Sequence, residues 1–182
     1  FQKKEGVDTV TLPVATFERL EQSSQKATHV INELLNTQTL DVLKDQEVQS
    51  MSNFLTDWAV EQHQASVVVF QGDYLKQNVF KGQERLAFKI ALDVLIDNSV
   101  KYGASELKIY AAEPGLIVVK DDGSGMSMEQ LNQYGTPFNS TKSSGAGLGT
   151  FFAKQVLLNS GWTMEAQQCK SGAMIELRKR SS

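Results

Sequence analysis

The sequence predicts an α/β fold made of one compact unit that follows a long helix. Several stretches carry apolar residues at spacings of three and four, which is typical of amphipathic helices. Between them lie short stretches that are continuously apolar or alternate with polar residues, as strands do. The chain has 182 residues, close to one ordinary domain with a helical appendage and enough to bury a hydrophobic core.

The composition is that of a globular protein, with 41% hydrophobic residues, 21% charged residues and a net charge of -3. A chain with this charge has no overall basic field, so nucleic acid is not an expected partner. The longest apolar run, residues 65–70, is far shorter than the ~20 residues of a membrane helix, so no membrane contact is expected. Cys169 has no second cysteine to pair with, which favours a reducing, cytoplasmic setting. The chain starts at Phe1 rather than at methionine, and we expect it to be a piece of a longer protein.

The first 45 residues are expected to precede the compact unit. Residues 1–14 have no clear period and are expected to form an irregular segment. Residues 15–45 are expected to be mainly one long helix, because their apolar residues lie three and four positions apart beside a polar face. A helix with a single apolar stripe needs a partner helix, from an upstream segment or from a second copy of the chain.

Residues 46–180 contain the alternating elements of the compact unit. Within them, the polar and glycine-rich residues 122–147 exceed the ~12–15 residues at which structureless connections become uncommon, so a functional lid is expected. The other predicted elements are a helix over 46–62, a buried strand over 66–70, a helix over 83–102 ended by Gly103, a hairpin of strands 107–111 and 116–119, a helix over 148–159, and a hairpin of strands 162–166 and 173–177.

The first of four polar blocks lies in the helix over 83–102. Asn98 offers a neutral oxygen, and Lys101 offers a cation close by on the helix surface. Mg²⁺ with a triphosphate needs that combination, because Mg²⁺ takes oxygen ligands and shares them with phosphates. The alternative is a surface ion pair between Asp97 and Lys101, worth ~0.3–0.5 kcal/mol, with Asn98 facing solvent.

The second block begins at Asp121, directly after an apolar strand. A carboxylate at a strand end can accept a hydrogen bond from an exocyclic amine such as that of adenine. Gly123 and Gly125 let the backbone approach a flat ring closely. The alternative is an exposed Asp-Gly turn, which is common, although such a turn does not explain why a long loop follows.

The third block lies in the predicted lid. Phe138 is an aromatic anchor in a Thr-Pro-Phe frame. Thr141 and Lys142 add a hydroxyl and an ammonium group, which suit a lid that packs down and reaches phosphate oxygens.

The fourth block, residues 145–149, leads into the start of a helix. It contains Gly145, Gly147, Leu148 and Gly149. Free backbone N–H groups and the helix dipole favour an anion at such a place. The pattern differs from the dinucleotide fingerprint, which follows a strand directly, and it lacks the Gly-Lys-Ser/Thr of a P-loop.

In this order, the four blocks resemble the N, G1, F and G2 boxes of the catalytic ATP-binding domain of bacterial sensor histidine kinases, within the wider family of ATPases that includes gyrase and Hsp90. Ser171-Gly172-Ala173 resembles the small-residue block before the closing strand, and the similarity covers residues 46–180. The resemblance implies a two-layer α/β sandwich with a mixed sheet, the Bergerat ATP-binding fold. Residues 15–45 are similar to the second helix of the dimerisation and phosphotransfer hairpin, and Phe80-Lys81-Gly82 is similar to the quorum-sensing hybrid type.

The resemblance also implies a role for each matched residue. Asn98 would bind Mg²⁺, and Lys101 and Tyr102 would contact phosphate or the nucleoside. Asp121 would bind the adenine amine. The other matched residues are Gly123 and Gly125 in the base pocket, Phe138, Thr141 and Lys142 in the lid, and Gly145, Gly147, Leu148 and Gly149 in the triphosphate cradle. Catalysis would depend on Asn98, Lys101 and Lys142.

Two features depart from the family pattern. Val94 stands where the kinases usually have Asn and the hydrolytic ATPases have Glu, which removes a polar contact near the metal and leaves no Glu base at this position. His29 is followed by Val30 and His63 by Gln64, so neither has the acidic neighbour and the following Pro of a phosphoacceptor histidine. We therefore expect the phosphoacceptor outside this chain.

The leading hypothesis is the kinase core of a two-component sensor histidine kinase, which uses ATP and Mg²⁺ and transfers the γ-phosphoryl group to a histidine outside the chain. Its expected partners are the phosphoacceptor helix of the same protein or of a dimer partner, and the receiver domain of a response regulator. The full-length protein is expected to be a homodimer, with this chain in the cytoplasmic part of a membrane-bound sensor. One alternative is a nucleotide-binding regulatory module that does not transfer phosphate, motivated by Val94. Another is an ATP-hydrolysing clamp, which needs the acidic base that Val94 replaces.

Overall fold

The computed structural model describes residues 49–63, 65–70, 72–137 and 148–180, together with Val14 and Glu18. The expected segment over 1–14 and helix over 15–45 lie outside the described residues, apart from those two positions. Among the described helices, none combines the length and the apolar character that crossing a membrane requires.

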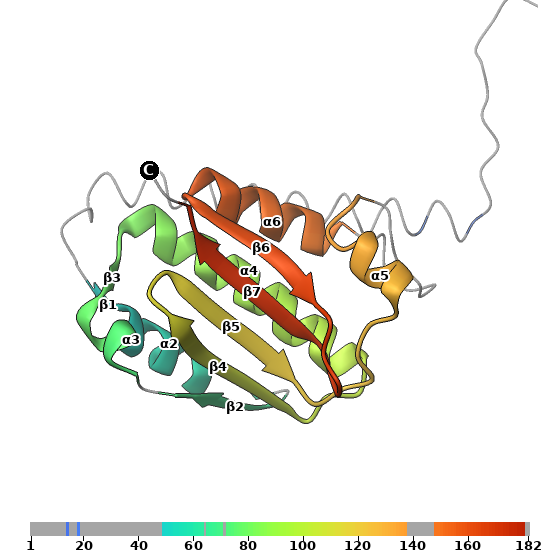
Figure 1. The fold of residues 1–182 in the computed structure, drawn as a ribbon, viewed down its shortest axis with the longest axis horizontal. Coiled ribbons are helices and arrows are strands. Elements are labelled where there is room, and N and C mark those ends of the chain that lie inside the picture. Colours follow the sequence, from blue (N-terminus) through green and yellow to red (C-terminus); the bar gives the residue numbers. More distant parts are fainter. Residues whose placement is uncertain are drawn as a thin grey trace, which may run out of the picture.

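One layer of the molecule is a five-stranded mixed sheet (Figure 1). Its strands are β2 (Ser66–Val69), β4 (Glu106–Glu113), β5 (Leu116–Asp121), β6 (Trp162–Gln167) and β7 (Met174–Lys179). They lie in the order β2-β4-β5-β7-β6, with β2 parallel to β4 and the other neighbours antiparallel. The predicted mixed sheet and both predicted hairpins, β4 with β5 and β6 with β7, are confirmed.

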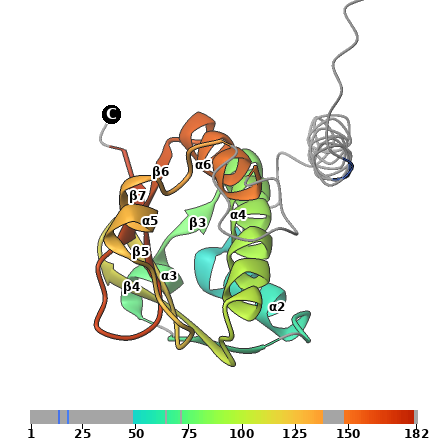
Figure 2. The same ribbon diagram turned by 90° about the vertical axis from the view of Figure 1, so that its right-hand side faces the viewer.

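The second layer contains α2 (Met51–Val60), α4 (Gly82–Lys101) and α6 (Gly149–Asn159). Figure 2 shows α4 and α6 side by side against one face of the sheet. At the start of α4, the Glu84 carboxylate accepts a hydrogen bond from the backbone N–H of Lys81 at 2.9 Å, which satisfies one of the free donors of that helix end. After α4, Gly103 has a φ of 84°, a conformation that glycine adopts without the steric cost of a Cβ.

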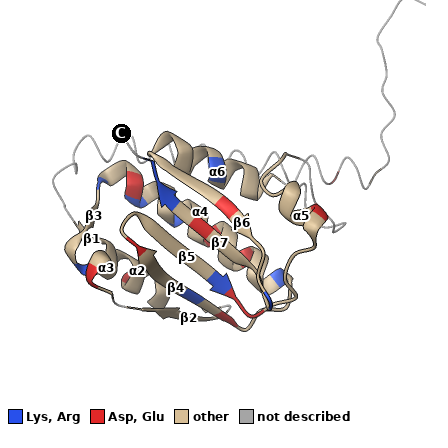
Figure 3. Ribbon diagram, in the orientation of Figure 1, with Lys and Arg blue, Asp and Glu red and all other residues tan. Residues whose placement is uncertain are grey.

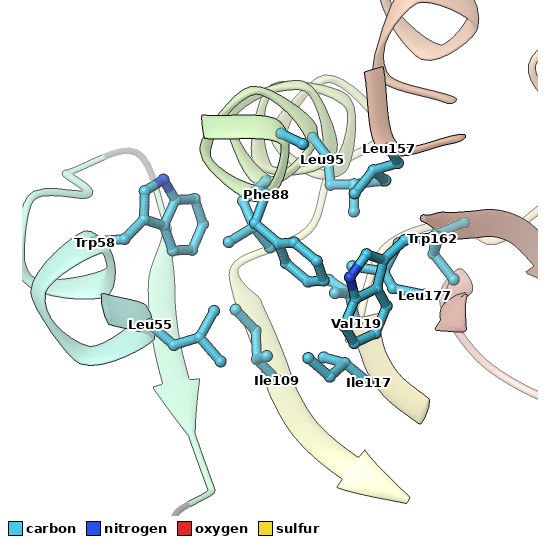
Figure 4. Close-up of a cluster of buried hydrophobic side chains, with 14 of the residues drawn as sticks. Leu55, Trp58, Phe88, Leu95, Ile109, Ile117, Val119, Leu157, Trp162 and Leu177 are labelled. Atoms are coloured by element: carbon cyan, nitrogen blue, oxygen red, sulfur yellow. The ribbon is translucent and has the colours of Figure 1, made fainter. Parts of the chain in front are cut away.

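The hydrophobic core lies between the two layers (Figure 4). Phe88 of α4 packs edge-on against Trp162 of β6, with ring centroids 4.8 Å apart. Around this pair, Ile117 and Val119 of β5 point toward the helices, and Leu157 of α6 reaches down from above. Each such fully buried side chain stabilises the fold by about 1.5–3 kcal/mol relative to leaving it in water.

The prediction that residues 66–70 form a buried strand is wrong about the burial. Among the described strands, β2 lies at the edge of the sheet, beside β4. Ser66 is exposed, the three valines that follow are half-buried, and Phe70 is 49% exposed. A run of β-branched residues predicts a strand, but burial depends on the position of the strand in the sheet, which is a long-range property.

The sequence predicted an irregular loop over residues 122–147, but part of this segment is helical. The short helix α5 (Met128–Asn132) interrupts this segment. Ser127 and Gln130 form a reciprocal capping box at its start, because the Ser127 hydroxyl accepts from the Gln130 N–H and the Gln130 side chain accepts from the Ser127 N–H. That Ser-x-x-Gln pattern is the local signal that could have predicted α5.

Two further features near α2 were also not predicted. The short helix α3 (Asp73–Gln77) contacts α2. β1 (Gln49–Ser50) pairs with β3 (Val79–Phe80) in a separate two-stranded sheet. α2 itself begins at Met51, later than the predicted start at residue 46, with the Ser50 hydroxyl capping it by accepting from the N–H of Asn53 at 3.1 Å.

Candidate functional site

The Asp121 carboxylate is held at the end of β5 by groups from three parts of the chain. Its Oδ1 accepts hydrogen bonds from the backbone N–H of Gly123 at 3.0 Å and of Ala173 at 2.8 Å. Its Oδ2 accepts one from the hydroxyl of Ser99 on α4 at 2.7 Å. A carboxylate has about four lone-pair sites, so this one keeps acceptor capacity for a ligand. The three bonds fix its orientation, as a binding group requires.

Glycines line the approach to Asp121 because a Cβ would collide with backbone atoms. A Cβ on Gly172, which has a φ of 70°, would lie 1.8 Å from the carbonyl oxygen of Asp121. A Cβ on Gly125 would lie 2.9 Å from the carbonyl oxygen of Gly172, and one on Gly123 would lie 3.0 Å from that of Tyr102. The chain therefore wraps closely around this strand end, and side chains at these positions would fill it.

Asp122, the next residue, fastens the same turn to the beginning of β4. Its carboxylate accepts from the backbone N–H groups of Ser105 at 2.8 Å and Glu106 at 2.9 Å, and from the Ser105 hydroxyl at 2.7 Å. The bond from the Ser105 hydroxyl, followed by those from the Glu106 and Ser105 N–H groups, lowers the pKa of Asp122 to about 2. Figure 3 shows this acidic end of β5. Asp122 thus has a structural role beside Asp121.

Asn98 and Thr150 join α4 to the beginning of α6. The Asn98 amide nitrogen, Nδ2, donates a hydrogen bond to the Thr150 hydroxyl at 3.2 Å. One turn earlier on α4, Val94 packs against Gly149, where a Cβ would lie 3.6 Å from Val94 Cγ1. The first four N–H groups of an α-helix have no partner within the helix, and its dipole favours negative charge there, so this corner can receive an anion. Leu148 is the N-cap residue, and its side chain makes no capping hydrogen bond.

Lys101 and Tyr102 lie at the end of α4. The Lys101 ammonium lies 3.9 Å from Asp97 Oδ2, and both side chains are about half exposed, so the predicted alternative of a surface ion pair is present, in a loose form. The carbonyl oxygen of Tyr102 accepts a hydrogen bond from the Ser124 N–H at 3.1 Å, which ties the glycine turn to α4.

The structure brings the first two predicted blocks together and sets the end of the fourth beside α4. Residues from the third block and most of the fourth, namely Phe138, Thr141, Lys142, Gly145 and Gly147, lie outside the described residues. His29 also lies outside them, whereas His63 is described and follows α2. Tyr134 sits between these blocks in the sequence and was not predicted as a site residue.

Three site residues escaped the sequence reasoning. Ser99 carries no sequence signal, because a serine in a helix is common and its contact with Asp121 spans 22 residues. Ala173 contributes only its backbone N–H, across 52 residues. The Tyr134 hydroxyl is buried without a hydrogen-bond partner in the described structure, and its burial, together with the charge of Asp121, raises its pKa. Its orphaned hydroxyl near Asp121 is a further group that a ligand could satisfy.

The residues present fit a purine nucleotide with a hard cation. The carboxylate with spare acceptor capacity and the glycine-lined approach suit a flat amine-bearing base. Within the described ranges there is no group of three or more His, Cys, Asp and Glu residues that could hold a metal ion. The Asn98 amide oxygen is of the type that Mg²⁺ accepts beside phosphate oxygens of a nucleotide.

A mixed sheet covered by helices on one face, with a held carboxylate at a strand end and a helix start opposite, defines an α/β nucleotide-binding domain. Residues 83–181, more than half of the chain, match the family model described as "Histidine kinase-, DNA gyrase B-, and HSP90-like ATPase". The chain belongs to this ATPase family.

Two bacterial proteins are similar in sequence to parts of this chain. One is the C4-dicarboxylate transport sensor protein DctB of Rhizobium meliloti (strain 1021), 32% identical over 80 residues. Another is sporulation kinase C of Bacillus subtilis (strain 168), 48% identical over 46 residues. The matches cover 42% and 25% of this chain, but 13% and 11% of those proteins. The chain thus matches a small part of these relatives.

Solved structures show the same fold at low sequence identity. The ATP binding domain of PrrB from Mycobacterium tuberculosis superposes with a TM-score of 0.57 at 19% identity, covering 76% of this chain and 98% of that one. The catalytic domain of histidine kinase ThkA superposes with a TM-score of 0.58 at 15% identity, covering 74% and 96%. Family and fold together confirm the predicted ATP-binding domain of the histidine kinase-, gyrase B- and Hsp90-like ATPase family.

Proposed function

We propose that this chain is the ATP-binding kinase core of a two-component sensor histidine kinase, and that it transfers the γ-phosphoryl group of ATP to a histidine outside the chain. The observation that carries the proposal is the Asp121 carboxylate, held by Ser99, Gly123 and Ala173 at a glycine-lined strand end. The names of the two relatives, a sensor protein and a sporulation kinase, support the same assignment.

Each site residue has a stated role in the proposal. Asp121 accepts a hydrogen bond from the exocyclic amine of adenine, and Gly123 and Gly125 leave room for the ring. The Asn98 amide oxygen binds Mg²⁺, and Lys101 and Tyr102 contact phosphate or the nucleoside. The remaining contacts are assigned to Phe138, Thr141 and Lys142 of the proposed lid, and to Gly145, Gly147, Leu148 and Gly149, which precede or begin α6 in the sequence.

This set of residues works by positioning and by electrostatics. Mg²⁺ held by the Asn98 amide oxygen would supply positive charge to stabilise the transferred phosphoryl group. Asp121 would hold the base and the start of α6 would hold the phosphates, so the protein's contribution would be to position the γ-phosphoryl group for transfer. Position 94 is occupied by Val94 and not by a carboxylate that could activate a water molecule. This favours phosphoryl transfer over ATP hydrolysis.

The partners follow from the same assignment. The phosphoacceptor histidine would lie on a hairpin helix of the same protein or of its dimer partner, and a response regulator receiver domain would accept the phosphoryl group afterwards. The proposed setting is the cytoplasmic part of a membrane-bound, homodimeric sensor. The finer assignment to the quorum-sensing hybrid type is supported by Phe80-Lys81-Gly82 at the start of α4.

Nucleotide titration of Asp121→Asn tests the proposal. Asn keeps the two backbone hydrogen bonds only if its amide oxygen takes the place of Oδ1. Its NH₂ group, which is a donor, then faces the Ser99 hydroxyl and the amine of the ligand. We expect the dissociation constant for Mg²⁺-ATP, measured by calorimetry, to rise about 10- to 100-fold, because a hydrogen bond to a charged group is lost. The matched control is Glu165→Gln, an exposed carboxylate on β6, which should bind like the unaltered chain. Equal affinities for ATP and GTP in the unaltered chain would contradict base reading by Asp121.

A second candidate, a nucleotide-binding regulatory module without phosphoryl transfer, is favoured by Val94. This side chain presents methyl groups to Gly149 at the corner where the kinases usually carry a polar residue. An incubation with labelled ATP distinguishes the two functions. It uses a protein that carries this chain together with the proposed histidine helix. Incorporation of acid-labile phosphate supports the kinase, whereas nucleotide binding without incorporation supports the regulatory module.

A further inference from the structure

The corner between α4 and α6 contains a polar contact that the family resemblance does not assign. Thr150 is the second residue of α6, and Asn98 lies 52 residues earlier on α4. The Asn98 Nδ2 donates to the Thr150 hydroxyl at 3.2 Å. α4 and α6 pack closely along their lengths, so this contact joins two rigid elements.

The contact decides which end of the Asn98 amide faces the nucleotide site. An asparagine amide has a donating nitrogen at one end and an accepting oxygen at the other, and the two exchange places when the group turns over. With Nδ2 bound to Thr150, the oxygen Oδ1 points the other way. In the described part of the chain, no residue donates a hydrogen bond to that oxygen. Oδ1 therefore remains available as a ligand.

Val94 offers no polar alternative at this corner. It lies one turn before Asn98 on α4, and its methyl groups lie 3.6 and 3.8 Å from the position that a Cβ on Gly149 would take. An apolar side chain makes no hydrogen bond, so Val94 does not favour either orientation of the Asn98 amide. The Thr150 hydroxyl, on the facing helix, is thus the group that can select one.

We propose that Thr150 is a positioning residue, which holds the Asn98 amide so that its oxygen binds the divalent cation of the nucleotide. The inference rests on the proposed function. In this proposal α6 contributes to metal binding through the Thr150 side chain, in addition to the backbone N–H groups that it offers to phosphate.

The test compares Thr150→Val, which keeps the shape and loses the hydroxyl, with Thr150→Ser, which keeps the hydroxyl. Calorimetry gives the dissociation constant of ATP for the full chain with Mg²⁺ and with EDTA. A neutral hydrogen bond corresponds to about a 3- to 10-fold effect. We expect Thr150→Val to weaken Mg²⁺-ATP binding by that factor and to leave metal-free ATP binding unchanged. Thr150→Ser should restore the ratio of the two constants.

A double-mutant cycle isolates the pair. In an Asn98→Ala background, Thr150→Val should leave the Mg²⁺ dependence of ATP binding unchanged, because the amide that it orients is gone. Thermal unfolding of each variant shows whether it is folded, and Thr150→Ala replaces Thr150→Val if the valine variant is not.

Three results would overturn the inference. Equal weakening with and without Mg²⁺ would mean that Thr150 belongs to the phosphate cradle or to the fold. An unchanged preference for Mg²⁺-ATP in Thr150→Val would mean that the hydroxyl does not orient the amide, and an increased preference would mean that it donates to Oδ1 and masks it. If the unaltered chain binds no nucleotide in either condition, the proposed function itself is wrong, and this inference with it.

Discussion

Gly172 shows how closely the backbone packs at the binding end of the sheet. Its φ is 70°, and a Cβ would lie 1.8 Å from the carbonyl oxygen of Asp121. We expect Gly172→Ala to lower the free energy of unfolding by at least about 3 kcal/mol, since the overlap is with backbone atoms and must displace β5 or the turn. Gly103→Ala is the matched control, because Gly103 has a φ of 84° and no atom within 4 Å of its Cβ position. It should cost about 1 kcal/mol, from conformation alone. Urea denaturation of both variants decides this, and similar losses would contradict the steric explanation.

The Tyr134 hydroxyl is buried and has no hydrogen-bond partner among the residues that the structure describes. Leaving such a group without a partner costs about 1–3 kcal/mol. Its ring packs against the core, so Phe at this position keeps the packing. We therefore expect Tyr134→Phe to raise the free energy of unfolding of the nucleotide-free protein by about 1 kcal/mol in urea denaturation. A loss of stability of similar size would show that the hydroxyl has a partner after all.

At the scale of elements, the Asp122 carboxylate fastens the turn after β5 to the start of β4. Its pKa of about 2 lies below the ~3.9 of an unfolded chain, so its contribution to stability is present above about pH 4 and lost as the pH falls toward 2. We expect the free energy of unfolding to fall over this window. In Asp122→Asn the fall should be smaller, and stability at neutral pH should be lower, because the amide replaces one acceptor oxygen with a donor.

The pH experiment needs a control because other acids titrate in the same range. Glu84 is one: burial raises its pKa, but hydrogen bonds from the Lys81 N–H, the Trp162 indole and Lys179 outweigh that effect and leave it lowered. The difference between unaltered protein and Asp122→Asn, measured by urea denaturation from pH 2 to 7, cancels the contribution of Glu84. Parallel curves for the two proteins would contradict the role given to Asp122.

For the whole molecule, particular residues show how much of the fold the sequence could predict. The helical spacing of residues such as Ile90, Ala91 and Leu95 predicted α4, because local periodicity reflects a buried face. Asp121 and the glycines that follow it predicted the turn after β5, because aspartate and glycine favour turns. Local patterns of this kind are readable from one segment at a time.

The parts that could not be predicted depend on contacts between distant segments. The edge position of β2 follows from strand order, to which its valines give no clue. The bonds from Ser99 and Ala173 to Asp121 join α4, β5 and the start of β7, which meet only in the folded chain. The Asn98–Thr150 contact has the same character. In each case a common residue acquires its role from its neighbours in space.

The described core makes a final prediction about the molecule as a unit. All of its buried members lie between Met51 and Leu177, so residues 46–182 should fold without the preceding 45 residues. We expect this fragment to unfold in one cooperative transition, with a urea midpoint close to that of the full chain. A second fragment, residues 46–160, lacks β6 and β7 and with them Trp162, which is fully buried against Phe88. It should show no cooperative transition, because β5 loses β7, one of its two neighbours in the sheet, and the core loses the side chains of β6 and β7. A non-cooperative 46–182 fragment would mean that the first 45 residues belong to the folding unit.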